Sequence, residues 1–515
     1  MKKIYEPFDL RVKKPIDKRF SVINLSDIDR PYEGLKVFQQ SDNKFYDFIN
    51  NQFIESNKSL NDAINLKVNK TDLPIKDVKK YGVIGDGVAN DTTAIQTVLN
   101  LGGNIYFPSG TYLVDGLTLS ANTTIIGDGD SSIIKLNNSK NTHVLQGSNI
   151  NNIKISQIKI DGNRTNQTTG NGIHLVTLNN IILQNVTFTN IKVNGIEFYN
   201  NVTNGIIEDC RVSYCGGCGF HSTLGVNTIN IRGGDYSYCD LSGILLINAN
   251  GSIIEGVKVH HNTTGGETSN GLSIQSNDVV IKGCELHDNS NAGIYTTNDN
   301  ISIVGNSSHH NLLGCDLYNG SRLRSNFVVM GNHFSYNTSK GHSAYWAEKI
   351  TCVGNIIDNN GNGTVPDPGV DYDSCTKVTF SDNILYFNKT YGISIRSTLG
   401  THISDSILIK DNDLNQNLTS AYYVDSSTSN YITIKDNYGY PTNVPMTSPS
   451  IPTSGSSVTN TSHRNVDVYI FSGTVTSVSI NGSSTGIVTG RFTLKPAETI
   501  GLTYSVAPTW YWFIQ

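Results

Sequence analysis

VKKYGVIGDGVANDTTAIQTVLNLGGNIYFPSGTYLV, residues 78–114, joins a Gly-Asp-Gly turn, one segment of helical length and two short strand-like runs. Asp91 stands directly before the apolar positions of the central segment, so we expect it to be the N-cap of a helix that ends near Asn100. The runs IYF and TYLV follow at once, bounded by Gly and Pro. A helix placed before a series of short strands can cover the apolar end of a repetitive core.

A repeated segment, which starts with Gly and an apolar residue, follows from residue 172. The steps between its marker glycines are 23, 24, 24, 28, 22 and 21 residues, for Gly172, Gly195, Gly219, Gly243, Gly271, Gly293 and Gly314. A period in the twenties indicates a solenoid, and the Leu-x-x-Leu-x-Leu frame of leucine-rich repeats is missing. Apolar residues alternate in short runs separated by Asn or Gly. We therefore predict an all-β fold, a single-stranded right-handed parallel β-helix of about 11 coils with Asn ladders at its turns.

Composition excludes several classes of protein. The chain has 515 residues, 48 Gly, 3 Met and a formal charge of -5, and its longest basic cluster is short, which argues against nucleic acid as a partner. No stretch approaches the roughly 20 apolar residues of a membrane span, and the N-terminus lacks the apolar core of a signal peptide. All 8 Cys fall in the repeats. We expect Cys215 and Cys239, at matching places in successive repeats, to be stacked interior thiols, and the Cys215–Cys218 pair not to bind metal.

The opening motif as a whole, YGVIGDGVANDTTAIQTVL followed by GNIYFPSGTYLV, resembles the start of the pectate-lyase-like β-helix superfamily. The resemblance covers residues 75–440 and implies a β-helix there, with the capping helix near 91–100. In that superfamily this opening, after a short N-terminal extension, is frequent in bacteriophage tail spikes and appendages. The resemblance therefore implies a homotrimer that folds in the host cytoplasm and joins the virion tail. Its implied partners are a bacterial surface glycan and, through a virion-anchoring segment at residues 1–43, other tail proteins.

The flanks predict three further segments. In residues 44–74 the spacing of Ile49, Phe53, Leu60, Ile64 and Val68 is close to the helical period, which predicts a helical, coiled-coil-like segment between subunits. Residues 441–462 are rich in Pro, Ser and Thr and read as a linker. Residues 463–515 show strand alternation with an Asn-Gly turn, typical of a small β-sandwich. For its aromatic run, Trp510, Tyr511 and Trp512, we favour a packing role over sugar binding.

One outer face of the coils collects the residues that could carry chemistry. Because side chains alternate after each marker glycine, positions two and four point outward and repeat on successive coils. Position two gives His174, Glu197, His221, Leu245, Ser273, Tyr295, Asp316, Ala344, Asp371 and Ser394. Position four gives Val176, Tyr199, Thr223, Ile247, Gln275, Thr297, Tyr318, Trp346, Asp373 and Arg396.

The later part of this face combines sugar-stacking rings with acidic and hydrogen-bonding groups. The rings are Tyr295, Tyr318 and Trp346, and the polar groups are Asp316, Asp371, Asp373, Glu348 and Arg396. We expect an elongated glycan-binding groove here, walled by the insertions at residues 260–270 and 359–373.

Glycoside hydrolysis needs a carboxylic acid and a carboxylate. Asp316 and Asp371 should lie two coils, roughly 10 Å, apart, and Asp371 and Asp373 roughly 7 Å apart, which is nearer the inverting than the retaining separation. We therefore favour an inverting hydrolase with Asp316 as acid and Asp371 or Asp373 as base. A polysaccharide lyase, a non-catalytic receptor-binding spike and a structural appendage remain alternatives. The residue sets of polygalacturonases and calcium-dependent pectate lyases are not found.

A second group, His174, Glu197 and His221, should stack on three consecutive coils. Two imidazoles and a carboxylate are ligands that transition metals accept. Ladders of polar side chains are common on β-helix surfaces, and that is the interpretation we favour. We expect neither a metal nor a cofactor.

Overall fold

The computed structural model describes most of the chain. It describes residues 75–514 apart from 264–268, 319–321, 364–366, 399–401, 426–427, 429–430, 440–443 and 463, and, before residue 75, only the backbone of four short strands. The chain divides into two compact units, residues 1–75 and 76–515.

The strands of the first unit are β1 (Ser21–Val22), β2 (Lys36–Gln39), β3 (Lys44–Ile49) and β4 (Gln52–Glu55), which form one sheet in that order. β3 pairs antiparallel with both β2 and β4. The helix predicted from residue 44 is therefore wrong over β3 and β4. The aromatic residues of KFYDFI favour strand, and this preference outweighs the helical spacing of two apolar positions. The rest of that prediction, and most of the 1–43 segment, lies outside the described residues.

The second unit opens with the predicted helix, α2 (Thr92–Asn100), which buries Ile95, Val98 and Leu99. Asp91 is at the N-cap position, but its side chain makes no hydrogen bond to the helix. Its carboxylate instead accepts from the backbone N–H groups of Ile84 at 2.8 Å and Gly85 at 2.9 Å. The prediction of Asp91 as the N-cap is confirmed in position, and its charge fixes the Gly-Asp-Gly turn against the helix.

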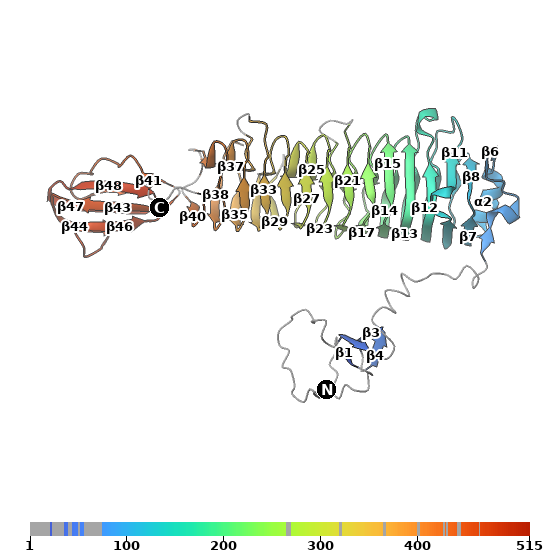
Figure 1. The fold of residues 1–515 in the computed structure, drawn as a ribbon, viewed down its shortest axis with the longest axis horizontal. Helices are drawn as coiled ribbons and strands as arrows, with labels where there is room; N and C mark the ends of the chain where they lie inside the picture. Colours follow the sequence, from blue (N-terminus) through green and yellow to red (C-terminus); the bar gives the residue numbers. More distant parts are fainter. Residues whose placement is uncertain are drawn as a thin grey trace. The chain divides into compact units, whose positions relative to one another are not determined.

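The chain then winds through three parallel sheets that run along one axis (Figure 1). The strands β12 (Leu145–Asp161), β13 (Ile173–Ile191) and β14 (Ile196–Glu208) are long enough to pass through more than one sheet. The first sheet also contains β5 (Lys76–Asp77), β7 (Gly103–Phe107), β10 (Thr123–Gly127), β17 (Asn227–Arg232), β20 (Ile253–Glu255), β23 (Val279–Lys282), β26 (Ile301–Val304), β29 (Arg324–Met330), β32 (Ala347–Val353), β35 (Thr376–Ser381), β38 (Asp405–Lys410) and β40 (Ile432–Lys435).

The second sheet contains β6 (Asp86–Asn90), β8 (Gly110–Val114), β11 (Ser132–Leu136), β15 (Arg211–Cys215), β18 (Asp235–Ser237), β21 (Lys258–His260), β24 (Glu285–His287), β27 (Ser307–His309), β30 (His333–Ser335), β33 (Ile356–Asp358) and β36 (Ile384–Tyr386). The third contains β9 (Leu117–Thr118), β16 (Phe220–Ser222), β19 (Ile244–Ile247), β22 (Leu272–Gln275), β25 (Ala292–Thr296), β28 (Leu313–Leu317), β31 (His342–Tyr345), β34 (Val370–Asp373), β37 (Tyr391–Arg396) and β39 (Ser420–Val424). Short 3-10 helices span η2 (Val78–Tyr81), η3 (Gly129–Ser131) and η4 (Arg164–Asn166).

The predicted right-handed parallel β-helix is confirmed, with about 14 turns in place of about 11. The difference arises because the first coils lack the marker glycine, which is replaced by Val144 on one of them. Coils of this kind cannot be recognised from the glycine repeat. Where the glycines stand, they stack closely: a Cβ on Gly219 would lie 2.5 Å from the carbonyl oxygen of Gly243, and one on Gly314 would lie 2.3 Å from that of Gly341. The marker is Gly because the adjacent coil leaves no room for a side chain.

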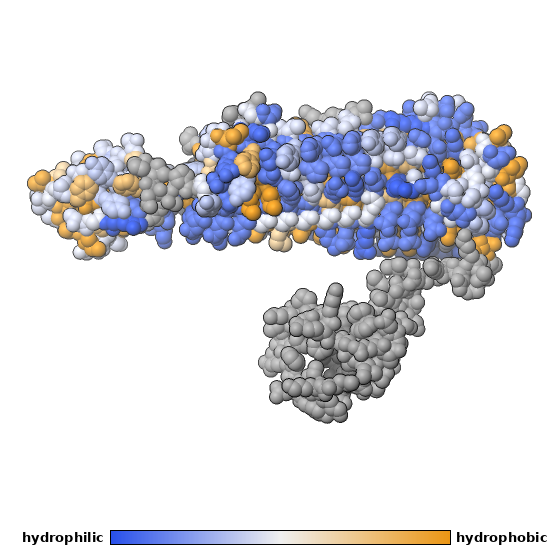
Figure 2. Space-filling model, in the orientation of Figure 1, coloured by the Kyte–Doolittle hydropathy of each residue, from blue (hydrophilic) through white to orange (hydrophobic). Residues whose placement is uncertain are grey.

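Two Asn ladders hold the turns, as predicted. Between the second and third sheets, each side-chain amide donates to the carbonyl oxygen of the next in the series Asn262, Asn289, Asn311, Asn337, Asn360, Asn388 and Asn417. A similar ladder joins the first and second sheets. Apolar side chains fill the interior, and the visible surface of the β-helix is mostly hydrophilic (Figure 2). All eight Cys are buried free thiols, with Cys215 against Cys239 as expected.

The C-terminal residues form two four-stranded antiparallel sheets. One contains β41 (Val444–Pro445), β48 (Thr509–Ile514), β43 (Val466–Phe471) and β46 (Gly490–Leu494), and the other β42 (Ser456–Thr459), β47 (Thr499–Val506), β44 (Thr474–Ile480) and β45 (Ser483–Ser484). β41 and β42 come from the predicted linker, which is therefore wrong for those strands. Trp510 and Trp512 are buried in the core between the sheets, whereas Tyr511 is exposed. None of the helices in the described ranges has the length and apolar character needed to span a membrane.

Candidate functional site

The outer face predicted from the repeats is the outward side of the third sheet. Tyr295 on β25 pairs in register with Asp316 on β28, which pairs with Ser343 on β31. Ser343 pairs with Asp371 on β34, and Asp371 pairs with Ser394 on β37. Position two is thus confirmed on the coils of Tyr295, Asp316, Asp371 and Ser394.

The coil of β31 was assigned one residue out of register. Ser343 and Tyr345, not Ala344 and Trp346, occupy positions two and four. Side chains alternate with a period of two, so a slip of one residue places an inward residue on the outer face, and Ala344 is in fact buried in the core. Trp346 lies beyond β31 with a φ of 50°, and its ring meets that of His402 edge-on at 5.5 Å. Trp346 is therefore not part of the row of aromatic rings on this face.

Asp371 is fully buried, although it points to the outer side of the sheet. Two cations cover it: Arg396 Nε donates to Oδ1 at 3.0 Å while a terminal guanidinium nitrogen contacts Oδ2, and Lys340 Nζ lies 2.6 Å from Oδ2. Burial alone would lower the pKa of Lys340, but the Asp371 carboxylate raises it. Tyr345 completes the group, because its hydroxyl contacts Lys340 Nζ and lies 3.5 Å from Asp371 Oδ2.

Asp373, on the same strand, is also buried and engaged. Its Oδ1 accepts from the backbone N–H of Thr398 at 2.9 Å and from the Ser374 hydroxyl at 3.0 Å, and its Oδ2 accepts from the Thr398 hydroxyl. Arg396 lies 3.8 Å from Oδ2. Asp373 thus shares one guanidinium with Asp371.

Asp316 differs from both because, among the residues that the structure describes, no cation contacts it directly. It is buried, and Ser343 Oγ donates to its Oδ1 at 2.7 Å. Burial is the main cause that raises the pKa of Asp316 to about 6, with a further contribution from the Asp371 charge and an opposing one from Lys340. A carboxyl group that titrates near pH 6 can donate a proton under mildly acidic or neutral conditions.

Three tyrosines line the same face beside these carboxyl groups. The rings of Tyr295 and Tyr318 stack with centroids 6.1 Å apart, and Tyr318 meets Tyr345 edge-on at 5.9 Å. Tyr318 is 42% exposed, so that its ring is available to a ligand. The row Tyr295, Tyr318 and Tyr345 replaces the predicted row that ended in Trp346. Such rings suit the apolar faces of sugars.

Glu348 lies on another sheet. It is on β32, in the first sheet, where it pairs in register with Ser325 and Thr376. Its carboxylate forms ion pairs with Lys377 at 3.0 Å and Lys349 at 3.5 Å. It is not among the residues that contact Asp316 or Asp371.

The sequence prediction missed Lys340, Ser343, Tyr345 and Thr398. The signal for two of them was present, since Gly341 continues the marker series and fixes Ser343 and Tyr345 two and four residues later. Lys340 precedes that glycine, and Thr398 follows the end of β37. Their contacts depend on how turns fold over the sheet, for which the repeat carries no signal.

The second predicted group is also stacked as expected. His174, Glu197 and His221 pair in register on successive coils of the third sheet. Glu197 accepts from both imidazoles, with contacts of 2.6 Å to His174 Nδ1 and 3.3 Å to His221 Nδ1, and from the amides of Asn171 and Asn194. Although burial would raise it, the hydrogen bonds from the two imidazoles lower the pKa of Glu197. The group is a closed polar ladder.

Two family models match the chain. One, described as rhamnogalacturonase A/epimerase, pectate lyase-like, matches residues 75–286, and one for the right-handed β-helix region matches residues 242–406. Fold and matches together define a single-stranded right-handed parallel β-helix protein. Residues 75–286 are thus similar to the pectate-lyase-like family, and the two matched regions together run from residue 75 to residue 406.

Curated relatives match over short segments. Mannuronan C5-epimerase AlgE5 of Azotobacter vinelandii is 35% identical over 109 residues, which is 17% of this chain and 11% of that protein. The pre-neck appendage protein of Bacillus phage phi29 is 36% identical over 106 residues, 19% of this chain and 12% of that protein. The chain thus spans about a tenth of the length of these relatives.

Solved structures match over more of the chain. The A-module of Azotobacter vinelandii mannuronan C-5 epimerase AlgE6 has a TM-score of 0.52 at 20% identity and covers 71% of this chain and 99% of its own. The Dettilon tailspike protein has a TM-score of 0.52 at 14% identity, with 85% and 94% covered. At these identities the likeness shows the fold alone.

Proposed function

We propose that this chain is a tail appendage of a bacteriophage that binds and cleaves a bacterial surface polysaccharide or teichoic acid on the outer side of its third sheet. The similarity to a phage pre-neck appendage protein and the shared fold of a phage tailspike support the virion location. In this proposal the chain is a homotrimer, and residues 1–43 attach it to other tail proteins after it folds in the host cytoplasm. A mass measurement of the purified full chain by light scattering tests the trimer.

The observation that carries the enzymatic part is the environment of Asp316. Its carboxyl group is buried, its pKa is raised to about 6, and it lies in register with Tyr295, whose ring stacks on that of Tyr318. A sugar stacked on these rings would bring a glycosidic oxygen toward the Asp316 carboxyl group, whose raised pKa lets it carry the proton to be donated. We assign Asp316 as the general acid of glycoside hydrolysis.

The roles of the other two carboxylates follow from their partners. Asp371 is held between Arg396 and Lys340 and is fully buried, so it is suited to position these two cations rather than to accept a proton. That leaves Asp373 as the proposed base of an inverting hydrolase, acting on a water once the Thr398 hydroxyl moves aside.

A second candidate reaction is β-elimination on a uronate. It requires cations that neutralise the sugar carboxylate and a group that transfers the proton beside it. Lys340, Arg396 and the Tyr345 hydroxyl are adjacent and match that requirement. The similarity to mannuronan epimerases favours a uronate as the substrate of this alternative. Against it, Asp371 and Asp373 already offset both cations.

Depolymerisation assays with Asp316→Asn test the proposal. Purified protein is incubated with surface glycans from candidate hosts, and chain length, new reducing ends and ultraviolet absorbance of unsaturated uronates are followed. Asp358→Asn is the matched control, because Asp358 is hydrogen-bonded to His333 on another sheet. We expect cleavage by the control and a loss of about 100-fold or more in Asp316→Asn. Reducing ends without the absorbance identify a hydrolase, and both signals together identify a lyase. Full activity of Asp316→Asn would refute the assignment.

A further inference from the structure

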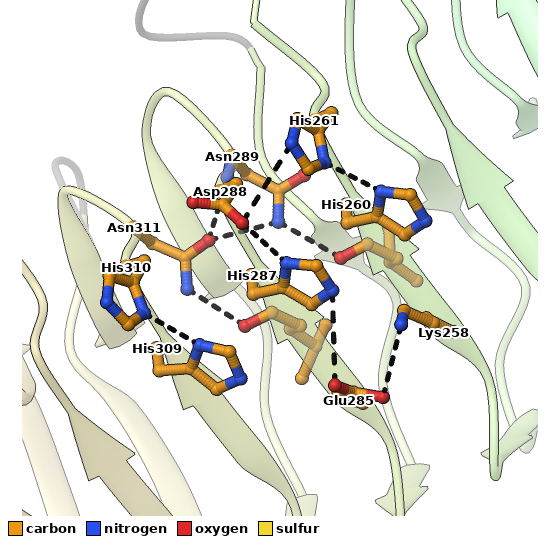
Figure 3. Close-up of polar contacts among 12 residues, drawn as sticks. Lys258, His260, His261, Glu285, His287, Asp288, Asn289, His309, His310 and Asn311 are labelled. Atoms are coloured by element: carbon orange, nitrogen blue, oxygen red, sulfur yellow. Dashed lines mark hydrogen bonds and ion pairs between the residues drawn. The ribbon is translucent and has the colours of Figure 1, made fainter.

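We propose that His261, His287 and Asp288 form a binding site for a divalent transition-metal ion such as Zn²⁺, on the turn between the second and third sheets. One nitrogen of each imidazole and one carboxylate oxygen lie within 4.8 Å of one another. Figure 3 shows the Asp288 carboxylate directed at both rings. The group uses none of the residues assigned to glycan cleavage.

The backbone brings these side chains together. His261 and Asp288 follow β21 and β24, and each is the first residue of a turn with a left-handed φ, 54° and 53°. Because the same turn recurs on adjacent coils, the two side chains stand one above the other. His287, the last residue of β24, stacks on His260 with ring centroids 4.8 Å apart. The coil repeat therefore places two imidazoles and one carboxylate on one small patch.

The separations are close to those of a metal site. Asp288 Oδ2 lies 2.7 Å from His287 Nδ1 and 4.0 Å from His261 Nε2. Around a tetrahedral Zn²⁺ with bonds of about 2.0–2.1 Å, ligand atoms lie roughly 3.3 Å apart. One of these two contacts must therefore open and the other close by less than about 1 Å, and the third separation, which is at most 4.8 Å, must close by no more than about 1.5 Å. The His261 and Asp288 side chains are 41% and 44% exposed, so water can occupy the fourth position.

A chain of hydrogen bonds orients His261 for this role. His261 Nδ1 lies 2.8 Å from His260 Nδ1, and His260 Nε2 lies 3.1 Å from Asp235 Oδ2. Asp235 accepts, so His260 carries its proton on Nε2 and accepts at Nδ1 from His261. The lone pair of His261 is then on Nε2, the atom that faces Asp288. Metal-binding imidazoles are usually held by such an outer chain that ends in a carboxylate.

His287 is held differently, because among the described residues its buried Nε2 has no hydrogen-bond partner. Without metal its Nδ1 donates to Asp288, and this bond lowers the pKa of Asp288, although burial opposes the effect. A metal at Nδ1 requires the ring proton on Nε2, and Glu285 Oε1 lies 3.9 Å from that atom.

Equilibrium dialysis of the chelator-treated full chain against Zn²⁺ tests the site. We expect one ion per chain near neutral pH, and in His261→Asn and Asp288→Asn an affinity at least about 100-fold weaker, since loss of an outer partner alone costs roughly 10–100-fold. Asn is well suited to the left-handed turn, so both variants should fold. His333→Asn is the control, because His333 pairs with Asp358 alone among the described carboxylates.

Thermal unfolding gives an independent readout. An ion that binds only the folded chain raises its melting temperature. We expect Zn²⁺ to stabilise the wild type and His333→Asn but neither ligand variant. Equal binding by all four proteins, or no binding by the wild type, would overturn the proposal.

Discussion

Arg396 and Asp371, on the adjacent strands β37 and β34, form a two-point ion pair in which Nε donates to Oδ1 at 3.0 Å and a terminal nitrogen contacts Oδ2. The carboxylate is fully buried. A buried charge is tolerated only while it is paired, so this contact ties the stability of the third sheet to the layout of the site.

Replacing Arg396 should therefore unfold the site more readily than replacing both partners. We expect Arg396→Leu to lower the free energy of unfolding by about 3 kcal/mol, because Lys340 is then the only cation of the described part of the chain in direct contact with Asp371. The double variant Arg396→Leu with Asp371→Leu should recover part of that loss. Urea unfolding measures the free energy of unfolding of both variants. A single variant as stable as the wild type would show that the ion pair contributes little.

Stability should depend on pH through Asp316. Its pKa is raised to about 6 from 3.8, so the folded state holds this proton more tightly than the unfolded chain. The associated stabilisation, about 3 kcal/mol, is present below pH 4 and is lost as pH rises through about 6. Asp316→Asn, which stays neutral, should thus exceed the wild type in stability at pH 8 but not at pH 4. Melting temperatures of both proteins between pH 4 and pH 8 test this prediction. The same pH dependence of melting temperature in the two proteins would contradict it.

Acid should destabilise the core of the β-helix because it favours the protonated form of His342. This imidazole is buried between Phe334 and Tyr372, and burial lowers its pKa to about 4. Above about pH 6.5 the imidazole is neutral in both the folded and the unfolded chain. Its protonation in the unfolded chain then lowers the free energy of unfolding by about 3 kcal/mol as pH falls toward 4. His342→Phe should flatten this dependence in urea unfolding. His342→Leu provides a second, smaller replacement. An unchanged slope in both variants would exclude His342 as the titrating group.

The glycine stack predicts a sharp difference between two Ala substitutions. A Cβ at Gly219 meets the carbonyl oxygen of Gly243 at 2.5 Å, so that two coils must separate. We expect Gly219→Ala to cost about 3 kcal/mol or more. Gly256 has a positive φ but no atom within 4 Å of the added carbon, so Gly256→Ala should cost about 1 kcal/mol. Thermal unfolding compares them, and similar losses would mean that the stack is not tightly packed.

The β-helix could be predicted from the sequence because successive coils share one sequence pattern. The Gly-apolar marker, the period and the Asn turns each have a steric or hydrogen-bonding cause that recurs over many successive coils. The prediction failed where that local rule stops. Residues 44–55 carry both a helical spacing and strand-forming aromatics, and the strand preference is the one the structure follows.

The site was predicted in part. Asp316, Asp371, Asp373 and Arg396 were placed on one face because alternation from a marker glycine is reliable over a few residues. The prediction is wrong for Trp346 because Gly341, and not the residue after it, is the marker of that coil. The contacts of Lys340 and Thr398, at the turns, and the burial of Asp371 cannot be predicted from the repeat, since a linear pattern does not show which side chains fold back over a sheet.

The location of the glycan tests the account most directly. A crystal structure of Asp316→Asn with an oligosaccharide of the cleaved surface polysaccharide should show sugar rings against Tyr295, Tyr318 and Tyr345, with a glycosidic oxygen within hydrogen-bonding distance of residue 316. An oligosaccharide bound to another sheet or to the C-terminal domain, with the tyrosine row empty, would contradict the proposed site.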